Sequence, residues 1–145
     1  LLLGELRGRG FAAQGSSRFA GGQGLLSLDL RGPAQADLPG NITTAVLCAW
    51  SGGVAECAAD PEGTRAVNVD GNLALISRLQ QSGARVIFVS TSLVFAGRDT
   101  GPYSVLLPCC EYARQKAAVE QAADVVVRLT KVGETLLPRL RAWAG

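Results

Sequence analysis

The chain has 145 residues, a length typical of one domain, and a folded domain of that size buries roughly 68–70% of the surface of the extended chain. Its 14 basic and 12 acidic residues are scattered, which argues against a nucleic-acid groove or a contact with an anionic membrane surface. No apolar run approaches the roughly 18 residues that span a bilayer, and the N-terminal residues lack the pattern of a signal peptide, so we expect a cytoplasmic protein.

Four cysteines are present, and they bear on metal binding. Cys48, Cys57, Cys109 and Cys110 form no C-x-x-C pair, and the chain contains no histidine. Zinc sites draw on these residue types at short spacings, so we expect no metal site and interpret the thiols as buried or reduced.

The first third of the chain is rich in short apolar segments. Residues 1–9 have the pattern of the last turns of a helix, and strands are expected at 10–15, 24–30 and 42–50. Apolar residues in the expected strands of the chain run consecutively rather than alternately, which is typical of strands buried on both faces.

A long helix is expected at 59–83. Asp60 is a suitable N-cap, Pro61 falls in the first turn where its missing N–H costs nothing, and Gly83 follows the end. The remaining expected elements are a strand at 84–92, a helix at 111–121 and a strand at 124–130. This order of strands and helices predicts an α/β protein with a Rossmann-like doubly wound parallel sheet.

Polar residues follow most of the expected strands. In an open parallel sheet, ligands bind beyond the carboxyl ends of the strands, so residues at those ends are candidates for binding. The candidates are residues 14–18, Asp29, residues 48–52, residues 90–92 and Thr130. Together they are predicted to line one edge of the sheet.

The helix at 111–121 carries a tyrosine and a lysine that are four residues apart. This spacing lets the side chains of Tyr112 and Lys116 share one helix face. The pair is either a catalytic couple or two long amphipathic side chains at a surface, and the spacing alone leaves both open. Tyr103, the other tyrosine, has no lysine four residues later.

Three motifs occur together and in order, namely "VAECAADPEGTRAVNVDGNLAL" at 54–75, "VSTSLVFAG" at 89–97 and "EYARQK" at 111–116. With them the chain, from about Phe11 to Val132, resembles the extended short-chain dehydrogenase/reductases. The resemblance is greatest to dTDP-4-dehydrorhamnose reductases and related sugar-nucleotide-binding proteins of the NAD-dependent epimerase/dehydratase superfamily.

The resemblance implies a catalytic role for three residues. Tyr112 matches the acid/base tyrosine of that family, Lys116 its lysine, and Thr91 its catalytic hydroxyl. A phenol can protonate a carbonyl oxygen when its pKa, ordinarily near 10, is brought down, and an adjacent ammonium lowers that pKa. The Thr91 hydroxyl would orient and polarise the same carbonyl by hydrogen bonding.

The cofactor is inferred from the end of the first expected strand. NAD-binding sheets usually place an acid there, whereas NADP binders can offer an arginine to the 2′-phosphate. The segment "QGSSR" has no acid and ends in Ser17 and Arg18, so we favour NADP(H) over NAD(H), with a solvated loop arginine as the alternative. The resemblance implies further cofactor contacts from Asp29, Leu30, Cys48, Ala49, Trp50, Asn68, Tyr112 and Lys116. Trp50 departs from the small residues usual at its position, and Asn68 could instead be a polar residue on an exposed turn.

A glycine-rich phosphate loop between a strand and a helix is not found in the chain. The approximate match "GRGFAAQG", which starts at Gly8, follows a helix and precedes a strand. The family would place its first strand and this loop before Leu1, at the centre of a sheet ordered 3-2-1-4-5-6. We therefore expect residues 1–145 to form a partial Rossmann domain, with unpaired central strand edges and without the C-terminal substrate-binding portion.

The sequence thus predicts part of an NADP-dependent reductase of a 4-keto sugar nucleotide. Alternatives are a nucleotide-sugar epimerase or dehydratase that keeps its nicotinamide bound, and a non-catalytic Rossmann module that senses dinucleotides. The expected partner is a sugar-nucleotide substrate, with a homodimer as a further option and without nucleic acid or membrane.

Overall fold

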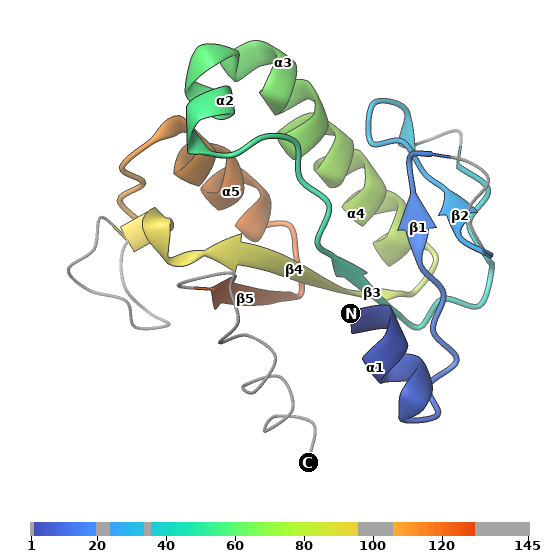
Figure 1. Ribbon diagram of the computed structural model, residues 1–145. Coiled ribbons are helices and arrows are strands. Elements are labelled where there is room, and N and C mark those ends of the chain that lie inside the picture. The colour runs from blue at the N-terminus through green and yellow to red at the C-terminus, as the bar shows by residue number, and fades with distance from the viewer. Residues whose placement is uncertain (1, 20–23, 34–35, 96–105, 130–145) are drawn as a thin grey trace.

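A computed structural model describes residues 2–19, 24–33, 36–95 and 106–129 of the chain. In chain order the elements are α1 (Leu2–Gly8), β1 (Ser16–Ser17), β2 (Leu26–Ser27), β3 (Thr44–Leu47), α2 (Val54–Ala59), α3 (Pro61–Arg65), the π-helix η2 (Ala66–Gly71), α4 (Asn72–Gln81), β4 (Arg85–Thr91), the 3₁₀-helix η3 (Ser92–Phe95), α5 (Glu111–Glu120) and β5 (Val125–Leu129) (Figure 1).

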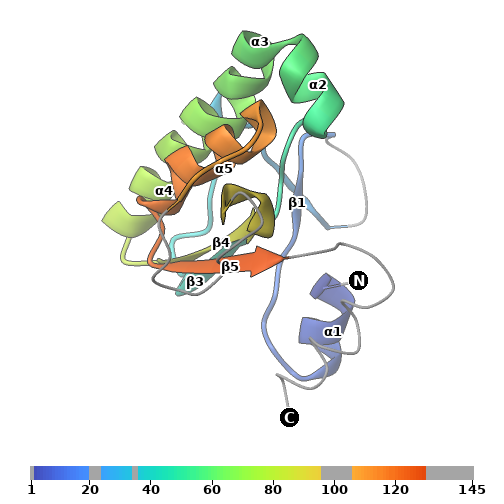
Figure 2. The ribbon, with the colours of Figure 1, turned by 90° about the vertical axis from the view of Figure 1, so that its left-hand side faces the viewer.

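The larger of two sheets in the described chain contains β3, β4 and β5. All neighbours in it are parallel, with β4 in the middle, Thr44 opposite Arg85 and Ile87 opposite Val125. Val86 and Phe88 of β4 are fully buried, whereas Ile87 and Val89 are only partly buried and Val46 of β3 is exposed. The burial of the strands on both faces that the sequence predicted is therefore found on one face only in the described residues. Helices α2 to α5 lie on one face of this sheet, and α4 and α5 pack on β4 (Figure 2).

The smaller sheet contains β1 and β2, which are also parallel, with Ser16 opposite Leu26. A groove of about 1090 Å³ lies between the two sheets, lined on one side by residues 12–16 and on the other by residues 43–49. The Rossmann-like parallel α/β architecture predicted from the sequence is confirmed. The strands nevertheless form two separate sheets, and none of the described strands joins β1 to β3.

The helical stretch predicted at 59–83 is one continuous run from Pro61 to Gln81, with a π-helical segment in its middle. Asp60 is its N-cap, because its Oδ1 accepts a hydrogen bond from Gly63 N at 2.9 Å. Gly71 lies against the end of the segment after β2, and a Cβ atom there would overlap the Leu30 carbonyl oxygen. Glycine at this position therefore allows the helix to cross the chain after β2 closely.

The sequence-based assignments differ from the structure in the first third of the chain. Residues 11–15 are not a strand, because pairing with β2 begins only at Ser16. The predicted strands at 24–30 and 42–50 are reduced to β2 and β3, and helix α2 was not predicted. In the described part of the chain, no helix is long and apolar enough to cross a membrane.

Candidate functional site

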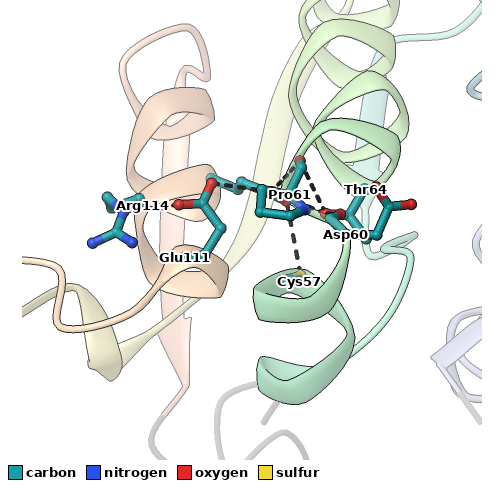
Figure 3. Close-up of polar contacts among 7 residues, drawn as sticks. Cys57, Asp60, Pro61, Thr64, Glu111 and Arg114 are labelled. Atoms are coloured by element: carbon teal, nitrogen blue, oxygen red, sulfur yellow. Dashed lines mark hydrogen bonds and ion pairs between the residues drawn. The ribbon is translucent and has the colours of Figure 1, made fainter.

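Helix α5 is fixed in place by a buried glutamine. Gln115 is 1% exposed, and its Nε2 donates to Pro61 O at 3.1 Å and to Thr64 Oγ1 at 3.0 Å. Its Oε1 lies 3.8 Å from Cys57 Sγ, so one side chain joins α5 to α2 and α3 (Figure 3). This network therefore holds α5, the helix that carries Tyr112 and Lys116, against α2 and α3.

Glu111 supports the same network from the first turn of α5. One carboxylate oxygen accepts from Gln115 Nε2 at 3.2 Å, and the other accepts from Arg114 Nε at 2.8 Å. Arg114 and Gln115 hold the pKa of Glu111 below its ordinary value by hydrogen bonding. Neither Gln115 nor Cys57 was singled out from the sequence; a glutamine on the same alanine-rich helix as the tyrosine and lysine was the available signal.

Lys116 lies in the interior, between α5 and β4. The residue is only 4% exposed, and its Nζ donates a 2.8 Å hydrogen bond to the Val89 carbonyl. The ammonium also lies 3.8 Å from the ring centroid of Trp50 and 4.8 Å from that of Phe88. Burial lowers the pKa of Lys116 to about 8, because the charged form loses its hydration.

Tyr112 lies one turn before Lys116 on α5 and also contacts Trp50. The two rings meet edge to face, with centroids 5.9 Å apart. The sequence led us to expect that Lys116 lowers the pKa of Tyr112, but burial instead raises it, with a smaller contribution from the thiols Cys57 and Cys110. The reason is geometric, since the ammonium is directed at Val89 and Trp50.

Thr91 is the last residue of β4, two residues after Val89. It is 9% exposed, and its Oγ1 accepts a hydrogen bond from Leu93 N at 3.3 Å, which starts the 3₁₀-helix η3. Helix α5 packs against both β4 and η3. Thr91 is thus at the strand end beside the helix that carries Tyr112 and Lys116.

The segment after β3 is anchored by Asn68. The Asn68 side chain is completely buried, accepts from Ser51 N at 2.7 Å and donates to Ser51 O at 2.9 Å. Asn68 Nδ2 also lies 2.9 Å from Gln115 Oε1. Asn68 is therefore not a residue of an exposed turn. Its hydrogen bonds to the Ser51 backbone hold the segment that carries Trp50 in place.

The other predicted cofactor residues follow β1, β2 and β3. Ser17 Oγ accepts from Phe19 N, and the exposed guanidinium of Arg18 stacks on the Phe19 ring at 4.7 Å. Asp29 is exposed and accepts from Arg31 N at 3.0 Å, whereas Leu30 is buried against the helix at Gly71. Cys48 and Ala49 are exposed and line the groove between the sheets. Thr130 and Tyr103 lie outside the described residues.

Comparison with protein families gives a match to the model of the NAD dependent epimerase/dehydratase family over residues 15–133. The chain belongs to this family. The matched range includes both sheets, α5 and all the predicted site residues. A search of curated proteins gave no match.

Several solved structures share the fold. MoeE5, solved with UDP-glucuronic acid and NAD, is 25% identical with a TM-score of 0.70, and the match covers 84% of this chain and 43% of MoeE5. The UDP-glucose 4-epimerase of Thermus thermophilus, solved with NAD, is 20% identical with a TM-score of 0.69, and the match covers 88% of this chain and 50% of the epimerase. A hypothetical dTDP-4-dehydrorhamnose reductase of Sulfolobus tokodaii is 17% identical with a TM-score of 0.72, and the match covers 87% of this chain and 50% of the reductase. The chain thus spans half or less of the length of these structures.

Proposed function

We propose that the protein is an NADP-dependent reductase of a 4-keto sugar nucleotide, and that this chain supplies its acid/base residues and part of its dinucleotide site. Membership of the NAD dependent epimerase/dehydratase family supports the reaction class. The observation that carries the proposal is the packing of α5 on β4. Lys116 donates to the carbonyl of Val89, two residues before Thr91, and Tyr112 lies one turn away on the same helix.

The proposed reaction needs a hydride at the keto carbon and a proton at its oxygen. A bound NADPH would supply the hydride. Tyr112 would donate its phenolic proton to the carbonyl oxygen. Burial raises the pKa of this phenol in the structure, so proton transfer would require the ammonium of Lys116 to turn toward it and lower that pKa. Thr91 would hydrogen-bond the same oxygen, and the ammonium of Lys116 would stabilise the phenolate that remains.

The residues present fit a dinucleotide in part. Arg18 is exposed after β1, where it would bind the 2′-phosphate of NADP, and Asp29 and Leu30 would lie against the adenine. Cys48, Ala49 and the backbone of Trp50 would flank the central portion of the dinucleotide. We propose further that residues 1–145 form only a partial dinucleotide-binding domain, since a groove of about 1090 Å³ separates β1 from β3.

A titration of this chain with NADPH and NADH, followed by nicotinamide fluorescence, tests the cofactor proposal. We expect weak binding of both, with NADPH the tighter, and loss of that preference in Arg18→Ala, because the guanidinium would pair with the 2′-phosphate. The matched control is Arg65→Ala, an exposed arginine on α3. Tight NADPH binding by the chain alone would contradict the partial domain, and a preference that Arg18→Ala leaves intact would contradict the role of Arg18.

A redox-neutral epimerase or dehydratase is the second candidate. MoeE5, at 25% identity, was solved with UDP-glucuronic acid and NAD, and that observation favours a cofactor that stays bound. The product of the complete reading frame that contains this chain separates the two. A reductase consumes NADPH in proportion to product formed, whereas a redox-neutral enzyme turns over without a loss of absorbance at 340 nm.

A further inference from the structure

Trp50 occupies the space between the segment after β3 and helix α5. Its indole contacts three side chains, with 3.8 Å from its ring centroid to Lys116 Nζ, 5.9 Å to the Tyr112 ring and 6.0 Å to the Phe88 ring. Its Nε1 is buried beside the Cys57 thiol, without an oxygen or nitrogen partner among the described residues. The indole is therefore held mainly by its ring and cation contacts.

The ammonium of Lys116 is enclosed by these contacts. One N–H is used on the Val89 carbonyl at 2.8 Å, and the rings of Trp50 and Phe88 lie at 3.8 and 4.8 Å. The lysine residue is 4% exposed, so a ligand hydroxyl cannot approach the nitrogen while the indole stays in place. Moving Phe88 is not an alternative, because Phe88 is fully buried in β4.

The backbone next to Trp50 is held in place by hydrogen bonds. The adjacent residue Ser51 donates from its N to Asn68 Oδ1, and its O accepts from Asn68 Nδ2. On the other side, Cys48 and Ala49 are exposed at the groove. A movement that uncovers Lys116 and keeps the Ser51–Asn68 hydrogen bonds would therefore be a rotation of the indole about χ1 and χ2.

We propose that Trp50 is an occluding side chain, whose indole covers the Lys116 ammonium and must rotate away before any ligand reaches it. Together with the proposed function, this makes dinucleotide binding depend on the fraction of molecules in which the indole has moved. The contact between a desolvated ammonium and an indole face stabilises the covered state, and it is strong enough to lower the apparent affinity for the dinucleotide by about tenfold or more. Trp50 is a positioning residue, since it acts through Lys116.

Reductive methylation with formaldehyde and borohydride, quantified by peptide mass spectrometry, tests the occlusion without any ligand. The chain has two lysines, Lys116 and Lys131, so each is followed separately. We expect Trp50→Ala to methylate Lys116 about tenfold faster than wild type, and Trp50→Phe to differ less, because a phenyl ring retains part of the cation contact. An unchanged rate in Trp50→Ala would overturn the proposal.

Amide hydrogen exchange in α4 distinguishes a local opening from a loss of structure. Leu75, Ile76 and Leu79 of this helix are buried in the core, so their amides exchange when the core opens. Faster methylation of Lys116 with unchanged exchange in α4 supports occlusion. A parallel rise in both, in Trp50→Ala and in the milder Trp50→Leu, would overturn it, because Trp50 would then be an ordinary core residue.

Titration of the same variants with NADPH and NADH tests the link to function. We expect the apparent Kd of Trp50→Ala for NADPH to fall by about tenfold. If Lys116 becomes reactive but neither dinucleotide binds more tightly, the occlusion stands and the assignment of Lys116 to the dinucleotide site is refuted.

Discussion

Replacement of Lys116 with methionine should stabilise the protein at neutral pH, and the gain should shrink as the pH rises. Methionine keeps the length and apolar packing of the lysine stem but removes the buried ammonium. The pKa of Lys116 is lowered from 10.5 to about 8 by burial, in a residue that is 4% exposed. The folded state therefore holds this charge at a cost that the unfolded state does not have.

The magnitude follows from proton linkage. One pKa unit corresponds to about 1.4 kcal/mol, so the shift from 10.5 to about 8 corresponds to about 3 kcal/mol. Between these two pKa values the unfolded state binds more protons than the folded state, so the stability of the wild type rises with pH. From pH 7 to pH 9 the contribution of Lys116 grows by about 1 kcal/mol.

Urea unfolding at pH 7 and pH 9, followed by far-UV circular dichroism, measures this effect. Lys116→Met and its parent are compared in a Cys48→Ser background, because the Cys48 thiol and the Lys116 ammonium influence each other's pKa. The buried Cys57 thiol, whose pKa is raised by burial, is present in both. The advantage of Lys116→Met should fall by about 1 kcal/mol between the two pH values, whereas Arg65→Met at an exposed site should show no such change. A pH-independent difference for Lys116→Met would refute the reasoning.

Three further changes test the packing around the site by urea unfolding. Asn68→Ala should lower the free energy of unfolding by about 2–4 kcal/mol, because it leaves the Ser51 backbone groups and the Gln115 amide oxygen unpaired. The control Asn41→Ala, at an exposed position, should change it by less than about 0.5 kcal/mol. A small loss for Asn68→Ala would contradict the anchoring role of Asn68. Gly71→Ala should lower the free energy of unfolding by more than about 2 kcal/mol, since its Cβ would overlap Leu30 O. The control Gly4→Ala, in an open part of α1, should raise it by about 0.5–1 kcal/mol. Equal effects at the two glycines would contradict the close approach of Gly71 to Leu30. Glu120→Gln should lower the free energy of unfolding by about 1–3 kcal/mol, because it removes the 2.8 Å ion pair between Glu120, 3% exposed, and Arg128, 23% exposed. The control Asp29→Asn, in an exposed ion pair, should cost less than about 1 kcal/mol. A larger cost for Asp29→Asn than for Glu120→Gln would contradict the role of burial.

Local rules and motifs predicted the second half of the fold well. The helix at Pro61 begins where an Asp-Pro pair places its cap, and β4 and α5 lie within two residues of the predicted ranges. The predicted parallel α/β fold also follows from this order. These elements depend on near neighbours in the chain, which is why a single sequence sufficed.

The first third of the chain and the chemistry of the site depended on tertiary contacts. Strand β1 is two residues long and pairs only with β2 in the described chain, and its bounds follow from that pairing rather than from local propensity. The spacing of Tyr112 and Lys116 correctly predicted one helix for both but not the direction of the ammonium, which is set by Val89 and by the indole of Trp50. For Gln115 the sequence offered only its place on the alanine-rich helix, because its role depends on the approach of α2 and α3.

The most direct test of the proposed function is NADPH oxidation by the product of the complete reading frame, with Tyr112→Phe as its matched variant. With a dTDP-4-keto-6-deoxy sugar as substrate, we expect absorbance at 340 nm to fall in proportion to the reduced sugar formed. Tyr112→Phe removes only the phenolic hydroxyl and should lower kcat by about 10²–10⁴-fold while NADPH affinity is retained. Undiminished NADPH oxidation by Tyr112→Phe would contradict the assignment of Tyr112 as the proton donor.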